Sequence, residues 1–119
     1  MNKVQQVLND AKTKYLESIT FMTNKVNDYS KSIAELEEKI SAFKYDVKLM
    51  SQAVSTNFEA NSINDLLEAE IGTCNAQLDI LAANLEHAKK NYDDTVKVIH
   101  KCNNEIFHIN HFLKNNGSV

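Results

Sequence analysis

The chain has 119 residues, with two glycines, no proline and no arginine, and its net charge is −3. This length corresponds to a single domain, and the scarcity of turn-forming residues excludes a fold with many strands and turns. Because specific recognition of phosphate and guanine relies on guanidinium groups, the missing arginine and the negative charge argue against nucleic-acid binding.

The first predicted element is a helix over residues 3–54. Apolar residues recur along it at alternating spacings of three and four, which is the pattern of a coiled-coil seam. A step of four from Tyr15 to Ile19 interrupts the alternation as a stutter, which relaxes the supercoil. The seam residues are Val4, Leu8, Ala11, Tyr15, Ile19, Met22, Val26, Tyr29, Ile33, Leu36, Ile40, Phe43, Val47, Met50 and Val54.

An alternative interpretation breaks this first helix near residues 28–32. Ser32 and Glu35 have the spacing of a capping box, and the residues just before them are polar. Three or four shorter helices would then form a compact bundle. The seam passes through Tyr29 and Ile33 without a slip, which favours the unbroken helix.

A turn is predicted over residues 55–62, the longest gap in the seam. Its Ser, Thr and Asn side chains compete with a helix for backbone hydrogen bonds. Ser62 and Asp65 resemble a capping box that starts a second helix, which is predicted over residues 63–114, with a short flexible tail over 115–119. The seam of this helix is Ile63, Leu67, Ile71, Cys74, Leu78, Leu81, Leu85, Ala88, Tyr92, Thr95, Ile99, Cys102, Ile106, Ile109 and Leu113.

The two seams fit one another if the chain folds back at the turn. Facing residues then have numbers that add to a nearly constant value, and large residues oppose small ones, as facing layers require. Phe43 would face Cys74, and Tyr29 would face Ala88. The predicted fold is therefore all-α, a long antiparallel helical hairpin. Because a two-helix hairpin buries only one seam, we expect it to associate into a four-helix bundle or a higher oligomer.

Few residues are candidates for chemistry. Glu105 and His108 match the Glu-x-x-His motif of di-iron bundles, and His111 lies one turn further on, but the second such motif that a di-iron site needs is missing. Cys74 and Cys102 are expected to be small core residues in a reducing compartment. We therefore expect no enzyme activity, no cofactor, no metal site and no small-molecule substrate.

Charge and apolar residues are unevenly distributed along the predicted hairpin. Residues 32–87 carry three lysines and ten acidic residues, and the two terminal segments carry ten lysines and six acidic residues. The segregation is compatible with head-to-tail association, with a charged partner at one end, or with no function. Toward the turn, Leu49 and Ile80 are isolated apolar residues off the seam. A larger set near the termini predicts an interface: Val7, Leu16, Phe21, Val98, Phe107 and Phe112.

These features predict a non-catalytic coiled-coil protein that acts through protein–protein interaction, as a self-associating scaffold, adaptor or structural component. The alternative is a small helical chaperone or inhibitor, of a phage or secretion type, that masks a partner's surface. No apolar run approaches the length of a membrane span, so we expect no membrane contact and a cytoplasmic location, or the virion or host cytoplasm for a phage protein. Abundant lysine, Asn and Ile without arginine fit an AT-rich phage or low-GC bacterial genome.

Overall fold

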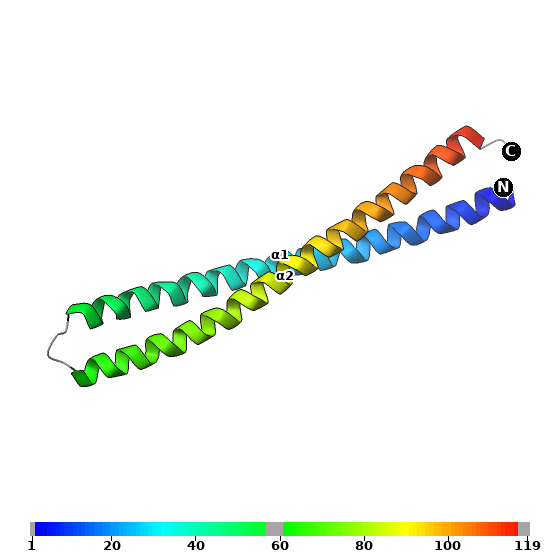
Figure 1. The fold of residues 1–119 in the computed structure, drawn as a ribbon. Coiled ribbons are helices and arrows are strands. Elements are labelled where there is room, and N and C mark those ends of the chain that lie inside the picture. The colour runs from blue at the N-terminus through cyan, green and yellow to red at the C-terminus, as the bar shows by residue number, and fades with distance from the viewer. Residues whose placement is uncertain (1, 57–60, 117–119) are drawn as a thin grey trace. The chain divides into compact units, whose positions relative to one another are not determined.

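The computed structural model describes residues 2–56 and 61–116, and the regular structure there consists of two α-helices. Helix α1 spans Lys3–Thr56 and helix α2 spans Asn61–Asn116 (Figure 1). The contacts divide the chain into unit 1, with Met1–Ser30 and Lys90–Val119, and unit 2, with Lys31–Lys89. In each unit a segment of α1 packs against an antiparallel segment of α2. The predicted all-α helical hairpin is confirmed.

Helix α1 continues without a break through residues 28–32. The alternative with three or four shorter helices is therefore not the fold that this chain adopts. Tyr29 and Ile33 stay half-buried across the segment in question. Burial of an amphipathic face stabilises a helix more than local propensity does, so the seam outweighs the capping box at Ser32.

The start of α1 carries a capping box that the sequence analysis did not identify. The backbone N–H of Gln5 donates to Oδ1 of Asn2 at 2.8 Å, and the backbone N–H of Asn2 donates to Oε1 of Gln5 at 3.4 Å. The two side chains thus accept reciprocally from backbone groups that a helix start leaves without partners. Asn and Gln perform here the role that Ser and Glu perform in the commoner motif.

The end of α1 lies two residues beyond the predicted one. The Ser55 hydroxyl donates to the carbonyl of Gln52 at 2.8 Å, and the Thr56 hydroxyl lies 3.2 and 3.1 Å from the carbonyls of Gln52 and Ala53. These short polar side chains were expected to oppose the helix. Instead their hydroxyls donate to backbone carbonyls in the last turn of the helix.

Helix α2 begins two residues earlier and ends two residues later than predicted. It already includes Asn61 and Ser62, so Ser62 lies inside the helix instead of capping it. At the other end, Asn116 still belongs to the helix, and its amide donates to the carbonyl of Phe112 at 3.1 Å. The rest of the predicted turn, residues 57–60, and of the predicted tail, residues 117–119, lies outside the described residues.

The predicted seam accounts for nearly all of the burial. Among its described positions, Val4 and Ile63 are exposed and the others are half-buried or buried. Thr95 is the polar member of the seam, and its hydroxyl donates to the carbonyl of Asn91 at 2.7 Å, which offsets the cost of burying it. Among the described residues the buried positions are all on α2 and, with one exception, small: Cys74, Ala88, Thr95, Cys102 and Ile109.

In unit 2 an ion pair joins the two helices. Nζ of Lys89 lies 3.8 Å from Oε1 of Glu37. Each of these residues directly follows a seam residue, a position from which side chains reach the partner helix. Both side chains are more than half exposed, so the pair contributes at most about 1 kcal/mol. Its value here is that it supports the antiparallel pairing of these segments.

Candidate functional site: interaction surfaces

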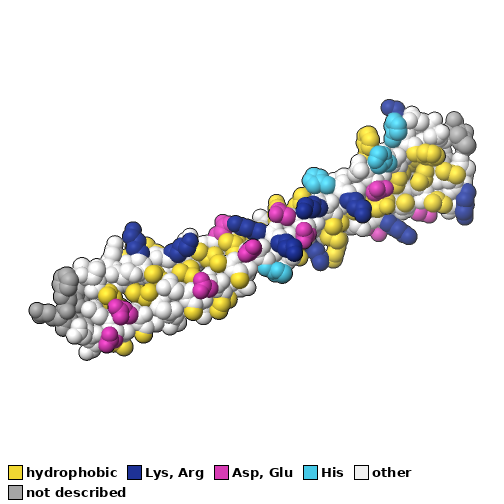
Figure 2. All heavy atoms as spheres, viewed as in Figure 1, with side chains coloured by type: hydrophobic (Ala, Val, Ile, Leu, Met, Phe, Trp, Pro, Cys, Tyr) yellow, Lys and Arg dark blue, Asp and Glu magenta, His cyan; other side chains and the backbone are white. Residues whose placement is uncertain are grey.

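The six residues predicted to form an interface are all exposed. Their exposed fractions run from 40% for Val98 to 63% for Phe107. All belong to unit 1, and we call them the apolar surface of unit 1: Val7, Leu16, Phe21, Val98, Phe107 and Phe112. Figure 2 shows hydrophobic side chains in this unit lying among lysine and histidine side chains. Their exposure is a finding; their role as an interface stays a prediction.

Phe21 carries a cation directly over its ring. Nζ of Lys25, one turn further along α1, lies 5.0 Å from the ring centroid. At an exposed site such a contact contributes about 0.5–1 kcal/mol. The pair presents to solvent an aromatic ring, 57% exposed, beside a positive charge.

The histidines near the end of α2 pack around Phe107. The ring of Phe107 stacks on His111, with centroids 6.2 Å apart and planes 12° apart, and meets His108 edge-on at 5.7 Å. The His111 ring also lies 3.0 Å from Nδ2 of Asn115. Within the described residues, no group of three or more His, Cys, Asp or Glu side chains is placed to hold a metal. The weak metal candidates Glu105, His108 and His111 thus do not form such a group.

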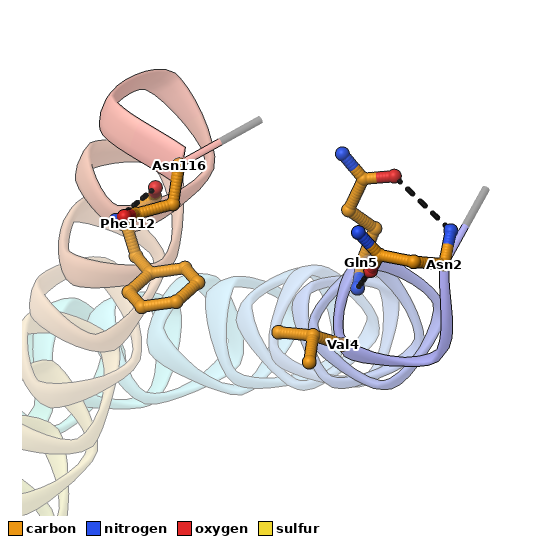
Figure 3. Close-up of a pocket in the computed structure, with 5 residues that line it drawn as sticks. All are labelled: Asn2, Val4, Gln5, Phe112 and Asn116. Carbon is orange, nitrogen blue, oxygen red and sulfur yellow. Dashed lines mark hydrogen bonds between the residues drawn. The ribbon is translucent and has the colours of Figure 1, made fainter. Parts of the chain in front are cut away.

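A small cavity lies in unit 1 between the start of α1 and the end of α2. Its volume is about 100 Å³, and Asn2, Val4, Gln5, Phe112 and Asn116 line it. Figure 3 shows Val4 and Phe112 pointing into the space between the helices. Small-molecule sites usually enclose roughly 300–1,000 Å³, so this cavity is too small for one.

Unit 2 exposes more apolar surface than the sequence analysis expected. Leu49 and Ile80 were identified, but Tyr45 is 61% exposed and Leu66 is 72% exposed. The exposure of Leu66 could have been predicted from the sequence. Leu67 occupies the seam, and adjacent residues of a helix face different directions. The apolar contrast between the two units is therefore weaker than predicted.

A groove in unit 2 combines an apolar floor with acidic edges. Asp46, Leu49 and Met50 of α1 and Glu70 and Cys74 of α2 line it, and we call it the acidic groove. Asp46 lies one turn after Phe43, the residue predicted to face Cys74, and the groove brings Asp46 and Cys74 together. Cys74 and Met50 are predicted seam residues, but the seam pattern does not predict a groove at this point.

Cys74 is the group in the groove with altered acidity. Burial raises the pKa of its thiol above the ordinary 9.0, and the negative charges of Glu70 and Asp46 raise that pKa further. The thiol also donates a weak hydrogen bond to Oε1 of Glu70, with Sγ 3.9 Å from the oxygen. Since the thiolate is the reactive form, this arrangement opposes nucleophilic chemistry at Cys74.

No helix in the described part of the chain is long and apolar enough to cross a membrane. Comparisons with protein-family models, with curated proteins and with solved structures each found no match.

Proposed function

We propose that this protein acts by binding protein and not by catalysis, as a self-associating scaffold or adaptor. The observation that carries the proposal is the apolar surface of unit 1, which a lone copy leaves in contact with water. Large apolar side chains that gather on the exposed surface of one unit are typical of a protein interface. The proposal needs no cofactor, metal, nucleic acid, membrane or small-molecule substrate, and it places the protein in the cytoplasm, or in the virion or host cytoplasm for a phage protein.

Burial of two phenylalanines provides a suitable driving force for association. Full burial of one such side chain is worth about 1.5–3 kcal/mol, and Phe21 and Phe112 are 57% and 44% exposed. Replacing both with Ser is expected to weaken self-association at least about tenfold, which corresponds to about 1.4 kcal/mol. Analytical sedimentation over a range of concentrations measures this, and circular dichroism shows whether the helices persist.

The matched control removes two exposed apolar residues from unit 2. Leu66→Ser with Ile80→Ser deletes a similar apolar area and is expected to change self-association less. If the Phe21/Phe112 variant sediments like the wild type, the apolar surface of unit 1 is not where copies meet. If the variant unfolds as a monomer, the two phenylalanines stabilise the fold of the single chain, and they are not a surface where copies meet.

A second candidate function is that of a small helical chaperone or inhibitor that masks a partner protein. The exposed Tyr45 and Leu66 of unit 2 favour it, because apolar surface in both units is what a protein that covers a foreign surface needs. A pull-down from the native host separates the two functions. A chaperone should retain one stoichiometric client, and a scaffold should retain itself or several proteins.

A further inference from the structure

The acidic groove of unit 2 exposes an apolar side chain to solvent and holds two carboxylates of like charge. Leu49 at its margin is 45% exposed. Asp46 and Glu70 lie on facing helices, and both carry the same charge close to the Cys74 thiol. The ion pair found among the described residues is that of Lys89 and Glu37, so no lysine in that part of the chain forms an ion pair with Asp46 or Glu70. A partner that fits it must be apolar and positively charged.

Unit 1 presents a group of this chemistry. Phe21 projects an exposed ring, and the Lys25 ammonium lies over it at 5.0 Å. We propose that Phe21 and Lys25 of a second copy of this chain dock into the acidic groove, with the ring against Leu49 and Met50 and the ammonium between the two carboxylates. This inference rests on the self-association proposed above and names the two surfaces that meet.

Charge complementarity favours a contact between unit 1 of one copy and unit 2 of another over a contact between two identical units. Two acidic grooves facing one another would bring four carboxylates together, and two Phe21–Lys25 pairs would bring two ammonium groups together. Like charges at an interface oppose association, whereas opposite charges favour it and set the orientation. Each copy carries one surface of each kind, so every copy can both offer and accept the contact.

The composition of the two units supports the same choice. Unit 2 contains ten acidic residues and five lysines, and unit 1 contains six acidic residues and eight lysines. Attraction between the units of different copies is therefore not limited to the groove. This gives the charge segregation along the chain a physical role.

Phe21 fits the groove better than the other exposed phenylalanines of unit 1. The ring of Phe112 is partly used within its own unit, since it lines the small cavity with Val4. The ring of Phe107 packs against His108 and His111. Phe21 alone among these three has a lysine ammonium over its ring in the described part of the chain.

A charge exchange tests the proposal in the full-length protein. Lys25→Glu places three acidic groups at each contact, and Asp46→Lys with Glu70→Lys places three basic groups there. Each variant alone is expected to self-associate at least about tenfold more weakly than the wild type in sedimentation at low salt. An equimolar mixture of the two variants restores opposite charges at every contact, and its dissociation constant is expected to return to within about threefold of the wild-type value.

Matched charge reversals elsewhere separate this contact from a general effect of net charge. Lys97→Glu in unit 1 and Asp79→Lys with Glu86→Lys in unit 2 change the net charge equally at exposed positions outside the groove. These variants should retain wild-type association to within about threefold. Circular dichroism of every variant identifies any loss of helix.

The outcomes distinguish this inference from the proposed function. If the mixture does not recover, or if Lys97→Glu weakens association as much as Lys25→Glu, the groove is not the docking site. If Phe21→Ser with Phe112→Ser weakens association while the charge variants do not, the apolar surface of unit 1 remains an interface and the groove is excluded. If the wild type is monomeric at every concentration, self-association and the groove contact both fail.

Discussion

Cys74 illustrates how one seam position acquires its chemistry from neighbours on both helices. Its side chain is 5% exposed, and Asp46 of α1 and Glu70 of α2 lie close enough to raise the pKa of its thiol. Sequence spacing predicted the seam position, and with it the burial. It did not predict the approach of Asp46, which depends on how the two helices face one another, whereas Glu70 lies one turn before Cys74 on the same helix and is its neighbour by spacing alone.

The first prediction concerns the reactivity of this thiol. Glu70→Gln removes one of the charges that raise the pKa of Cys74, so the pKa falls toward 9.0 and the thiolate fraction at a given pH increases. Alkylation of Cys74 by iodoacetamide at pH 8 should then be faster than in the wild type, as measured by mass spectrometry over time. The buried Cys102 of unit 1 is the internal control, and its rate should not change. Equal rates for Cys74 in both proteins would contradict the electrostatic cause.

The second prediction concerns Gly72, which lies inside α2. A Cβ added at this position would meet nothing within 4 Å, and glycine is about 1 kcal/mol less favourable than alanine within a helix. Gly72→Ala should therefore raise the free energy of unfolding by about 1 kcal/mol, measured by urea denaturation. The reverse change at the neighbouring exposed Ala76 should lower it by a similar amount. A destabilising Gly72→Ala would mean that another chain approaches the helix closely at this point.

At the scale of the elements, the seam pattern was enough to predict both helices and their amphipathic faces. The spacing of three and four is a direct consequence of helical geometry, so burial follows it along both chain segments. The ends of the helices were less predictable. Ser55 and Thr56 favour either a turn or a helix end, depending on whether their hydroxyls bond to the carbonyls of the preceding turn, and that choice is made by local geometry.

The third prediction tests the pairing of the helices in unit 2. Leu36 should lie beside Leu81 or Leu85, on adjacent turns of α2, and disulfides need Cα atoms closer than about 7 Å. In a background with both native cysteines replaced by alanine, Leu36→Cys paired with a cysteine at one of these two positions should form a disulfide within one chain. Leu36→Cys with Leu67→Cys is the control and should not. Mass and mobility under non-reducing conditions distinguish the products, and disulfides formed only between chains would show that the helices exchange partners.

At the scale of the whole molecule, the amount of buried side chain is small for the length of the chain. The accessible surface is 8671 Å² for a mass of 13.5 kDa, whereas a compact monomer of that mass exposes about 6,500 Å². Helix α1 contributes no buried residue. Sequence reasoning anticipated this thin core, since a single seam was available. It could not identify the acidic groove, whose residues come from two segments that meet only in the folded chain.

The last prediction follows from this thin core. A helix pair that buries one seam is marginal alone, so association should supply part of its stability. The melting temperature should therefore rise with protein concentration. A tenfold increase adds about 1.4 kcal/mol of stabilisation for a dimer, which for a chain of this size corresponds to a shift of about 2–6 °C. Thermal unfolding followed by circular dichroism at several concentrations measures this shift.

Phe21→Ser with Phe112→Ser should reduce the dependence of the melting temperature on concentration, while Leu66→Ser with Ile80→Ser should largely preserve it. A melting temperature that does not change with concentration would show that the single seam suffices, and it would remove the energetic reason for self-association.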